Sequence, residues 1–295
     1  MSALPVGGDF SAFCSNLRMS DSIVATVQAR YHAITKRINQ NYWNSTSETS
    51  HTLYVGSYGR GTAIYTSDID IVAELPWSVY TKYNNYSYNG QSALLQDLKC
   101  SLQQTYSSSS ISGDGQVVDV AFTDGILFEI VPSFLHSDGQ YTYPDTNNGG
   151  SWRTMNPKAE ADAFNAMNKE CNKNLKRLCR MARAWNAHMC VLIPGILIDT
   201  LAYKFLSGYE YKGNSYEYYD WVSRDFFQYL VSESDKSYWY KFGSGMRVNK
   251  KYSFCAEAKA AYALSLEAIE AYEKGYSYTG HGKWRDIYGT KFPTA

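Results

Sequence analysis

The stretch "GSYGRGTAIYTSDIDIV", residues 56–72, begins with a glycine and a serine and ends with two aspartates separated by one isoleucine. The alternating apolar residues at its end predict a strand, in which successive side chains point to opposite faces. Asp68 and Asp70 would therefore share one face. Two neighbouring carboxylates repel each other unless a cation lies between them, and Mg2+ prefers carboxylate oxygens that it shares with substrate phosphates.

The first residues of this stretch suit phosphate binding. We expect Gly56 to allow a close approach of the backbone and Ser57 to offer its hydroxyl to the same phosphates. Gly-Ser and Asp-x-Asp are each common in loops and turns, so neither is specific alone. Their combination in this order within one short stretch predicts a joint site for a phosphate and a metal ion.

A third acid is expected on a neighbouring strand, because two-metal phosphoryl transfer needs a further ligand for the second ion. The run "GILFEIVPSF" places Glu129 inside an apolar strand, where a buried charge requires a partner or a metal. The alternative is an edge strand with Glu129 facing water. Asp119 in "VVDVAF" is a rival ligand, whereas Asp124 precedes a glycine and is expected in a turn.

Positive charge for phosphates is concentrated in one predicted helix, "NLKRLCRMARAW", residues 174–185. At helical spacing, one face carries Lys173, Lys176, Arg180 and Arg183. A solvated basic face is the usual explanation of such a run, and binding of a triphosphate is the alternative. Arg183 borders the apolar stripe of this helix, so we expect it to be drawn inward.

The composition excludes several classes of partner. Lys plus Arg and Asp plus Glu both total 28 in 295 residues, so no overall field recruits a long nucleic acid or an acidic membrane. No stretch approaches the length of a membrane span, and the first residues lack a signal-peptide pattern. Six cysteines without paired spacing are typical of reduced thiols. We therefore expect a cytoplasmic protein without a membrane partner.

The first part of the chain predicts a mixed sheet with helices. Apolar residues recur at helical spacing over 21–42. Strands are expected at 52–56, 68–75, 117–122 and 126–131, with a helix over 92–106. This pattern is typical of an α+β fold. We assign residues 1–140 to this core and expect the long N-terminal helix to bridge it and the remainder.

The second part, residues 141–295, is predicted to be a mainly helical lobe. Residues 141–152 are rich in turn formers and are expected to form a loop. Asn156 and Pro157 then predict an N-cap and the first helical position. Helices are expected over 157–190, 194–207, 219–233 and 255–274.

The motifs "GSYGRGTAI", "SDIDI" and the acid in "FEIVP" resemble those of polymerase-β-like nucleotidyltransferases. More narrowly, the chain resembles the bacterial cGAS/DncV-like nucleotidyltransferases, the second-messenger oligonucleotide or dinucleotide synthetase group. The resemblance continues through "LKRLCRMARAW", "IDTLAYKFL" and "WRDIYGTKFP", and so covers most of the chain. It implies a polymerase-β-like core joined to a helical lobe. The implied activity is template-independent joining of NTPs into a cyclic di- or trinucleotide, in antiphage signalling through a separate effector protein.

The resemblance also implies roles for individual residues. Asp68, Asp70 and Glu129 would be the catalytic acids and would bind two Mg2+ ions, with Mn2+ as a substitute. The implied nucleotide-binding residues are Gly56, Ser57, Arg180 and Arg183. Arg183 stands where relatives carry a phosphate-binding lysine, which changes the donor geometry. Relatives often carry Ser-Tyr where this chain has Ile196 and Leu197, so the base-stacking residue stays open.

Other functions remain open at this point. The alternatives are a linear oligonucleotide synthetase, a nucleotidyltransferase that modifies an RNA or protein acceptor, and an inactive nucleotide-binding module. The even charge balance disfavours an RNA acceptor. The resemblance further implies an accessory ligase that joins Ala295 to a target. The sequence leaves the bases, the linkage and the ring size undetermined.

Overall fold

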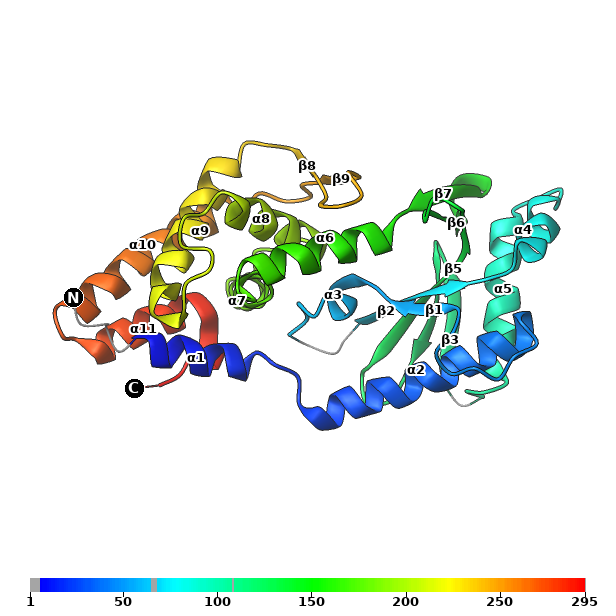
Figure 1. The fold of residues 1–295 in the computed structure, drawn as a ribbon, viewed down its shortest axis with the longest axis horizontal. Coiled ribbons are helices and arrows are strands. Elements are labelled where there is room, and N and C mark those ends of the chain that lie inside the picture. The colour runs from blue at the N-terminus through cyan, green and yellow to red at the C-terminus, as the bar shows by residue number, and fades with distance from the viewer. Residues whose placement is uncertain (1–5, 65–67, 108, 295) are drawn as a thin grey trace. The chain divides into compact units, whose positions relative to one another are not determined.

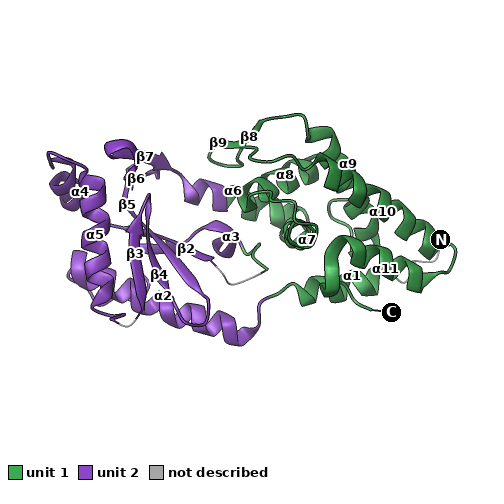
Figure 2. Ribbon diagram, turned by 180° about the vertical axis from the view of Figure 1, so that it is seen from behind, with its two compact units in different colours: residues 1–18, 61–64, 162–295 green, residues 19–60, 65–161 purple. Residues whose placement is uncertain are grey.

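The computed structural model describes residues 6–64, 68–107 and 109–294 (Figure 1). The chain divides into two compact units, which Figure 2 colours separately. Unit 1 comprises residues 1–18, 61–64 and 162–295, and unit 2 comprises residues 19–60 and 65–161. Ala295, the expected attachment point for a ligase, lies outside the described residues. No helix in the described ranges has the length and apolar character that a bilayer crossing requires.

This division differs from the expected boundary after residue 140. Residues 141–161 stay with unit 2, and the first 18 residues join the helical unit 1. The reason for the first difference is strand pairing, because residues 141–155 form two strands that extend the sheet of unit 2. The long helix over residues 21–42 belongs to unit 2.

Unit 2 contains the sheet and its helices. Its elements are α2 (Asp21–Tyr42), β1 (Thr52–Tyr54), α3 (Gly56–Gly59), β2 (Asp68–Glu74), α4 (Trp77–Asn84), α5 (Gly90–Gln103), β3 (Ser110–Asp114), β4 (Val117–Ala121), β5 (Leu127–Leu135), β6 (Tyr141–Asp145) and β7 (Ser151–Met155). The strand order is β1-β2-β5-β4-β3, with β6 joined to β5 and β7 joined to β6. Strands β2 and β5 are parallel, and the other pairs are antiparallel. The predicted mixed sheet is confirmed.

Helices α2 and α5 cover one face of this sheet (Figure 1). On β2, Ile69 and Ile71 are fully buried in the core that these helices form with the sheet. Asp68 on the same strand is exposed, and Asp70 is half-buried. The predicted alternation is therefore confirmed, with both aspartates on the face opposite the helices.

Unit 1 is mainly helical, as predicted. Its elements are α1 (Val6–Asn16), α7 (Asn174–His188), α8 (Gly195–Ser207), α9 (Tyr219–Glu233), β8 (Tyr238–Tyr240), β9 (Arg247–Asn249), α10 (Cys255–Glu273) and α11 (Ser277–Tyr288), and α6 (Pro157–Glu170) crosses the boundary between the units. Its core gathers buried aromatic rings from α1, α7 and α11, among them Phe10, Trp185 and Trp284.

Two local predictions were wrong. Residues 141–152, expected as a loop, form β6 and the start of β7, with the turn formers gathered between the strands. The helix expected over 157–190 is interrupted between α6 and α7, where Asn172 and Lys173 adopt left-handed backbone conformations. Neither residue is a glycine or a proline, so the usual sequence signals of a helix break are absent.

Candidate active site

Two of the acids predicted to bind metal, together with the rival Asp119, lie in one row across the sheet of unit 2. Strands β2 and β5 pair in parallel with Asp70 opposite Glu129. Strands β5 and β4 pair antiparallel with Glu129 opposite Asp119. Directly paired residues project from the same face of a sheet, so Asp70, Glu129 and Asp119 are neighbours, and Asp68 lies two residues along on the same face.

The backbone at Gly56 passes directly against one of these acids. Gly56 has a positive φ of 60°, and a β-carbon at this position would lie 1.6 Å from Oδ2 of Asp70. Only glycine avoids both the backbone strain and the clash. The backbone N–H of Val55 donates to the carbonyl oxygen of Asp70 at 2.9 Å, which fixes the loop against β2. Gly56 therefore allows a close approach of the backbone to the Asp70 carboxylate, and the expected approach to substrate phosphates stays a prediction.

The carboxyl groups of this row carry shifted pKa values. Burial, and then the neighbouring charges of Asp70, Asp119 and Asp68, raise the pKa of Glu129 to about 7. Burial also raises the pKa of Asp70, although the Arg60 guanidinium opposes this. Burial and the charge of Asp114 raise the pKa of Asp119. Acids with raised pKa values that face one another are typical of sites that hold a cation or move a proton.

The side chains fit a metal ion by their chemistry, without forming a ready-made cluster. Within residues 6–64, 68–107 and 109–294, no group of three His, Cys, Asp or Glu side chains is arranged to hold a metal. Asp70 and Glu129 instead lie directly opposite each other on β2 and β5, and the charge of Asp70 raises the pKa of Glu129. Oδ1 of Asp119 is buried and has no hydrogen-bond partner among the described residues. Carboxylate oxygens are the ligands that Mg2+ prefers.

Other residues around Gly56 were missed by the sequence reasoning. Gly59 must also be a glycine, because a β-carbon there would lie 2.5 Å from the carbonyl oxygen of Tyr54. Arg60 follows at the end of α3, is buried, and is the cation whose charge lowers the pKa of Asp70. The predicted phosphate contact Ser57 lies half-buried in α3. No local sequence pattern around Arg60 indicates that its side chain is buried.

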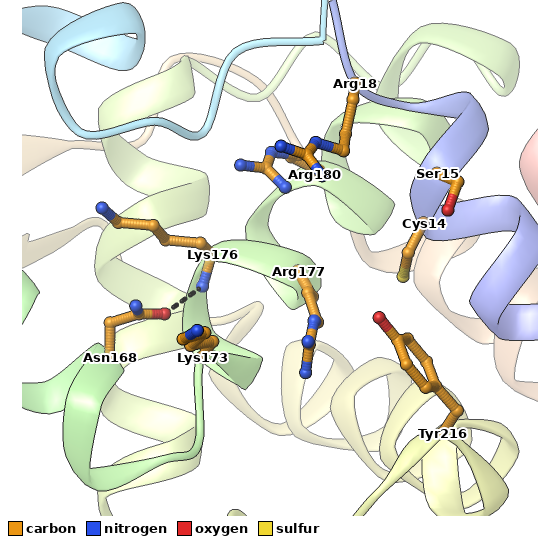
Figure 3. Close-up of a pocket in the computed structure, with 9 residues that line it drawn as sticks. All are labelled: Cys14, Ser15, Arg18, Asn168, Lys173, Lys176, Arg177, Arg180 and Tyr216. Atoms are coloured by element: carbon orange, nitrogen blue, oxygen red, sulfur yellow. Dashed lines mark hydrogen bonds between the residues drawn. The ribbon is translucent and has the colours of Figure 1, made fainter.

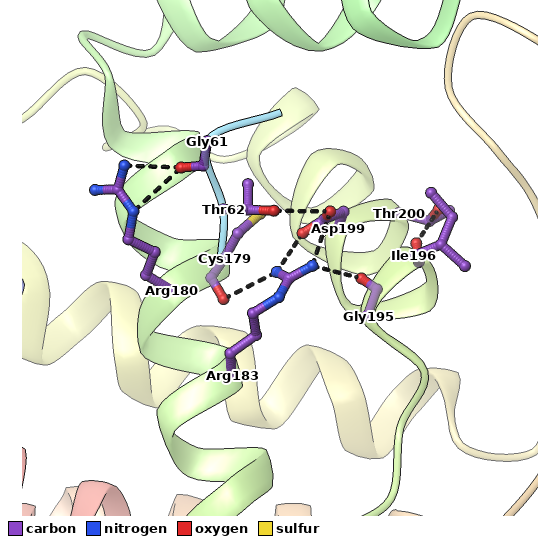
Figure 4. A network of polar contacts seen from close by, with 9 residues as sticks. All are labelled: Gly61, Thr62, Cys179, Arg180, Arg183, Gly195, Ile196, Asp199 and Thr200. Atoms are coloured by element: carbon purple, nitrogen blue, oxygen red, sulfur yellow. Dashed lines mark hydrogen bonds and ion pairs between the residues drawn. The ribbon is translucent and has the colours of Figure 1, made fainter. Parts of the chain in front are cut away.

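In unit 1, Arg183 forms a buried ion pair with Asp199 (Figure 4). Its Nη1 and Nη2 donate to the two carboxylate oxygens at 2.5 and 3.0 Å. They also donate to the carbonyl oxygens of Cys179 and Gly195, at 3.4 and 3.0 Å. Four of the five guanidinium N–H groups are thus used inside unit 1. The predicted inward position of Arg183 is confirmed, since only 9% of the residue is exposed.

Two contacts link residues 61–64 to this helical unit (Figure 4). The guanidinium of Arg180 donates twice to the carbonyl oxygen of Gly61, from Nε at 3.1 Å and from Nη2 at 2.7 Å. The Thr62 hydroxyl donates to Oδ2 of Asp199 at 3.1 Å. Asp199 and Thr62 were missed as partners, because their contacts join segments more than 100 residues apart in sequence.

The fold is similar to several solved structures of bacterial enzymes. CdnC of E. coli MS115-1, solved with ATP, superposes with a TM-score of 0.69 at 16% identity, over 98% of this chain and 99% of that chain. The CD-NTase CdnG of Bradyrhizobium diazoefficiens, in complex with GTP, gives 0.68 at 12% identity, over 97% and 95%. A mutant of the Vibrio cholerae di-nucleotide cyclase DncV gives 0.68 at 10% identity, over 94% and 92%.

The sequence itself identifies the family. A search of curated proteins found no match. The family model of the Second Messenger Oligonucleotide or Dinucleotide Synthetase domain matches residues 4–168, which is more than half of the chain and includes all of the candidate acids. The chain therefore belongs to the Second Messenger Oligonucleotide or Dinucleotide Synthetase family of bacterial cGAS/DncV-like nucleotidyltransferases.

Proposed function

We propose that this enzyme joins NTPs, without a template, into a cyclic di- or trinucleotide, and that Asp68, Asp70 and Glu129 carry the reaction. The observation that supports this most strongly is the row of carboxyls on one sheet face, in register across β2 and β5, with the Gly56 backbone pressed against Asp70. The family is one of synthetases of second-messenger oligonucleotides, which agrees with this chemistry.

The proposed step is a nucleotidyl transfer. A ribose hydroxyl oxygen of one nucleotide attacks the α-phosphorus of an NTP, the bond from that phosphorus to the pyrophosphate oxygen breaks, and pyrophosphate leaves. Asp70 accepts the hydroxyl proton, since it neighbours both Asp68, two residues along β2, and Glu129, directly opposite on β5. Bound Mg2+ would lower the pKa of the hydroxyl and neutralise charge on the leaving group. A second transfer within the linear product closes the ring.

The remaining residues divide into binding and positioning roles. We assign Gly56 and Ser57 to contacts with the phosphates of the donor NTP. We assign Arg180, in unit 1, to nucleotide binding. Because the Arg183 guanidinium is used by Asp199 and backbone carbonyls, we now assign Arg183 to positioning rather than to direct phosphate contact. Its ion pair holds Asp199, which in turn accepts from Thr62, in the segment that follows the glycine-serine motif.

Partners are proposed from the relatives. CdnC was solved with ATP and CdnG with GTP, and a complex of CdnC with HORMA is known. We propose NTPs as substrates here, a separate effector protein that the product activates, and a role in bacterial antiphage signalling in the cytoplasm. An accessory ligase acting on Ala295 remains part of this proposal.

Product analysis tests the activity. The purified chain with Mg2+ or Mn2+ and mixed NTPs should yield a species resistant to alkaline phosphatase, because a closed ring has no terminal phosphate. Its mass should equal two or three nucleoside monophosphates, each less one water. Asp70→Asn should abolish this product while leaving the thermal midpoint equal or slightly raised, since the amide relieves carboxylate repulsion in the metal-free protein.

Other outcomes would redirect the proposal. A phosphatase-sensitive ladder of lengths would indicate a linear oligonucleotide synthetase instead. Label that appears only on added RNA or protein would indicate a transferase for macromolecules. If Asp70→Asn stays fully active with Mg2+, the acid row does not carry the reaction.

A further inference from the structure

A basic pocket in unit 1 shares only Arg180 with the residues assigned to the proposed reaction (Figure 3). Its volume is about 450 Å³, which is within the size range of sites for small molecules. Every residue that lines it belongs to unit 1. The lining contains five cationic side chains and no carboxylate: Arg18, Lys173, Lys176, Arg177 and Arg180.

The side-chain hydrogen bonds of these cations to described residues go to neutral groups. Among the described residues, none of them forms an ion pair with a carboxylate. Arg177 donates to the backbone of Asn172 and to the side chains of Asn174 and Tyr219. Arg180 donates to the carbonyl oxygen of Gly61. Lys176, Arg177 and Arg180 are half-buried around a cavity. A basic helix face exposed to solvent therefore explains only part of this cluster of cations.

The cations also act on one another. Figure 3 shows the guanidinium groups of Arg18 and Arg180 close together at one end of the pocket. Burial, and then the charge of Arg18, lower the pKa of Arg180. Burial and the charge of Arg180 lower the pKa of Lys176. Like charges held this close destabilise the empty pocket, and an anion among them would relieve the repulsion.

The backbone at the start of α7 supports a binding role. Lys173 precedes α7 with a φ of 67°, a left-handed conformation that strains a non-glycine residue and that is common where ligands are held. It places a further ammonium group at the pocket, beside the helix N-terminus, where the macrodipole favours negative charge. Arg18, from the segment after α1, completes the pocket from a distant part of the chain.

We propose that this pocket binds a small, compact polyanion of the polyphosphate class, whether inorganic or the phosphate chain of a nucleotide, separately from the metal-dependent site. The five cations match several closely spaced phosphates, and multiply charged oxygens take charge-assisted hydrogen bonds from guanidinium and ammonium groups. An extended nucleic acid is disfavoured, because the positive charge is concentrated around one cavity and the chain as a whole is neutral.

Calorimetric titration with inorganic tripolyphosphate in EDTA tests this, because the acid row repels anions when no divalent cation is present. The double variant Arg18→Gln/Lys173→Gln should weaken binding at least tenfold. The matched control Lys204→Gln/Lys259→Gln removes the same charge from exposed positions on α8 and α10 and should bind like the wild type. Asp70→Asn should also bind normally.

The outcomes distinguish a nucleotide from an inorganic phosphate chain as the ligand, and they also show which results overturn the proposal. If ATP in EDTA binds more tightly than tripolyphosphate, and the pocket variant loses that advantage, the ligand is a nucleotide. If tripolyphosphate binds equally or better, the ligand is the phosphate chain alone. The proposal is overturned if the pocket and control variants weaken binding equally. It is also overturned if only a single-stranded oligonucleotide binds, or if binding needs Mg2+ and disappears in Asp70→Asn. None of these results depends on whether the enzyme makes a cyclic product.

Discussion

Oδ2 of Asp70 lies only 1.6 Å from the place where residue 56 would carry a β-carbon. The missing β-carbon of Gly56 therefore leaves room for the Asp70 carboxylate. A larger residue at position 56 would displace that carboxylate. The loop is held in this position by the bond from the Val55 N–H to the carbonyl oxygen of Asp70. The first residue of the glycine-serine motif and the second aspartate of Asp-x-Asp are thus one structural unit.

Gly56→Ala should displace the Asp70 carboxylate and abolish nucleotidyl transfer. Two effects contribute, namely the clash with Asp70 and the left-handed backbone that alanine adopts at a cost of about 1–2 kcal/mol. The matched control is Gly115→Ala in the β3–β4 turn. Gly115 has a φ of 61°, but a β-carbon there would meet nothing within 4 Å, so its substitution carries the strain without the clash.

The comparison is made by measuring the thermal midpoint and the turnover of both variants. The control should lose a little stability and keep its activity, whereas Gly56→Ala should lose stability further and show no product. Equal loss of activity in both variants would mean that backbone strain alone, rather than the position of Asp70, controls the reaction.

The sequence predicted the positions of these residues in the fold where the information is local. Alternation along one strand determined that Asp68 and Asp70 face away from the core, and the apolar run around Glu129 determined its strand. The register between strands is not visible in a single sequence, so Asp119 could be named only as a rival to Glu129 for the third metal ligand. The pairing of β4 with β5 places Asp119 opposite Glu129. The inward position of Arg183 followed from the apolar stripe, but its partner Asp199 comes from another helix.

Arg183→Ala should reduce stability strongly, by about 3–5 kcal/mol, because it leaves Asp199 as an unpaired charge that is fully buried. Asp199→Ala should have a similar cost. The double variant should lose much less than the sum of the two, since no buried charge is left without its partner. Urea denaturation of the four proteins measures this coupling. If Arg183→Ala keeps its stability and only raises KM for NTPs, direct phosphate binding by Arg183 is the better assignment.

Asp220 should make the stability of unit 1 depend on pH. Burial raises the pKa of this carboxyl from 3.8 to about 6, against the bond that it accepts from the Trp221 N–H. A raised pKa means that the stabilising contribution is complete below pH 3.8 and is lost as the pH rises through about 6. Asp220→Asn removes the ionisation and should be more stable than the wild type at pH 7, by up to about 3 kcal/mol.

The measurement is the urea midpoint of both proteins between pH 4 and pH 8. The difference between them should be small at pH 4 and grow through pH 6. Asp235→Asn, at an exposed position before β8, serves as the control for the loss of one charge and should follow the wild type. A difference between Asp220→Asn and the wild type that stays constant with pH would show that packing, rather than ionisation, separates them.

The last prediction decides between Glu129 and Asp119 as the third metal ligand. Glu129 lies directly opposite Asp70, whereas Asp119 lies one strand farther away. A cation bound by the aspartate pair therefore reaches Glu129 first. Glu129→Gln should weaken Mn2+ binding at least tenfold, as measured by electron paramagnetic resonance of the free ion. Asp119→Asn should bind Mn2+ within about threefold of the wild type, because Asp119 lies one strand farther away and the site keeps its three nearer acids. The opposite order would make Asp119, with its unpaired buried oxygen, the ligand on the neighbouring strand and leave Glu129 as the group that orients Asp70.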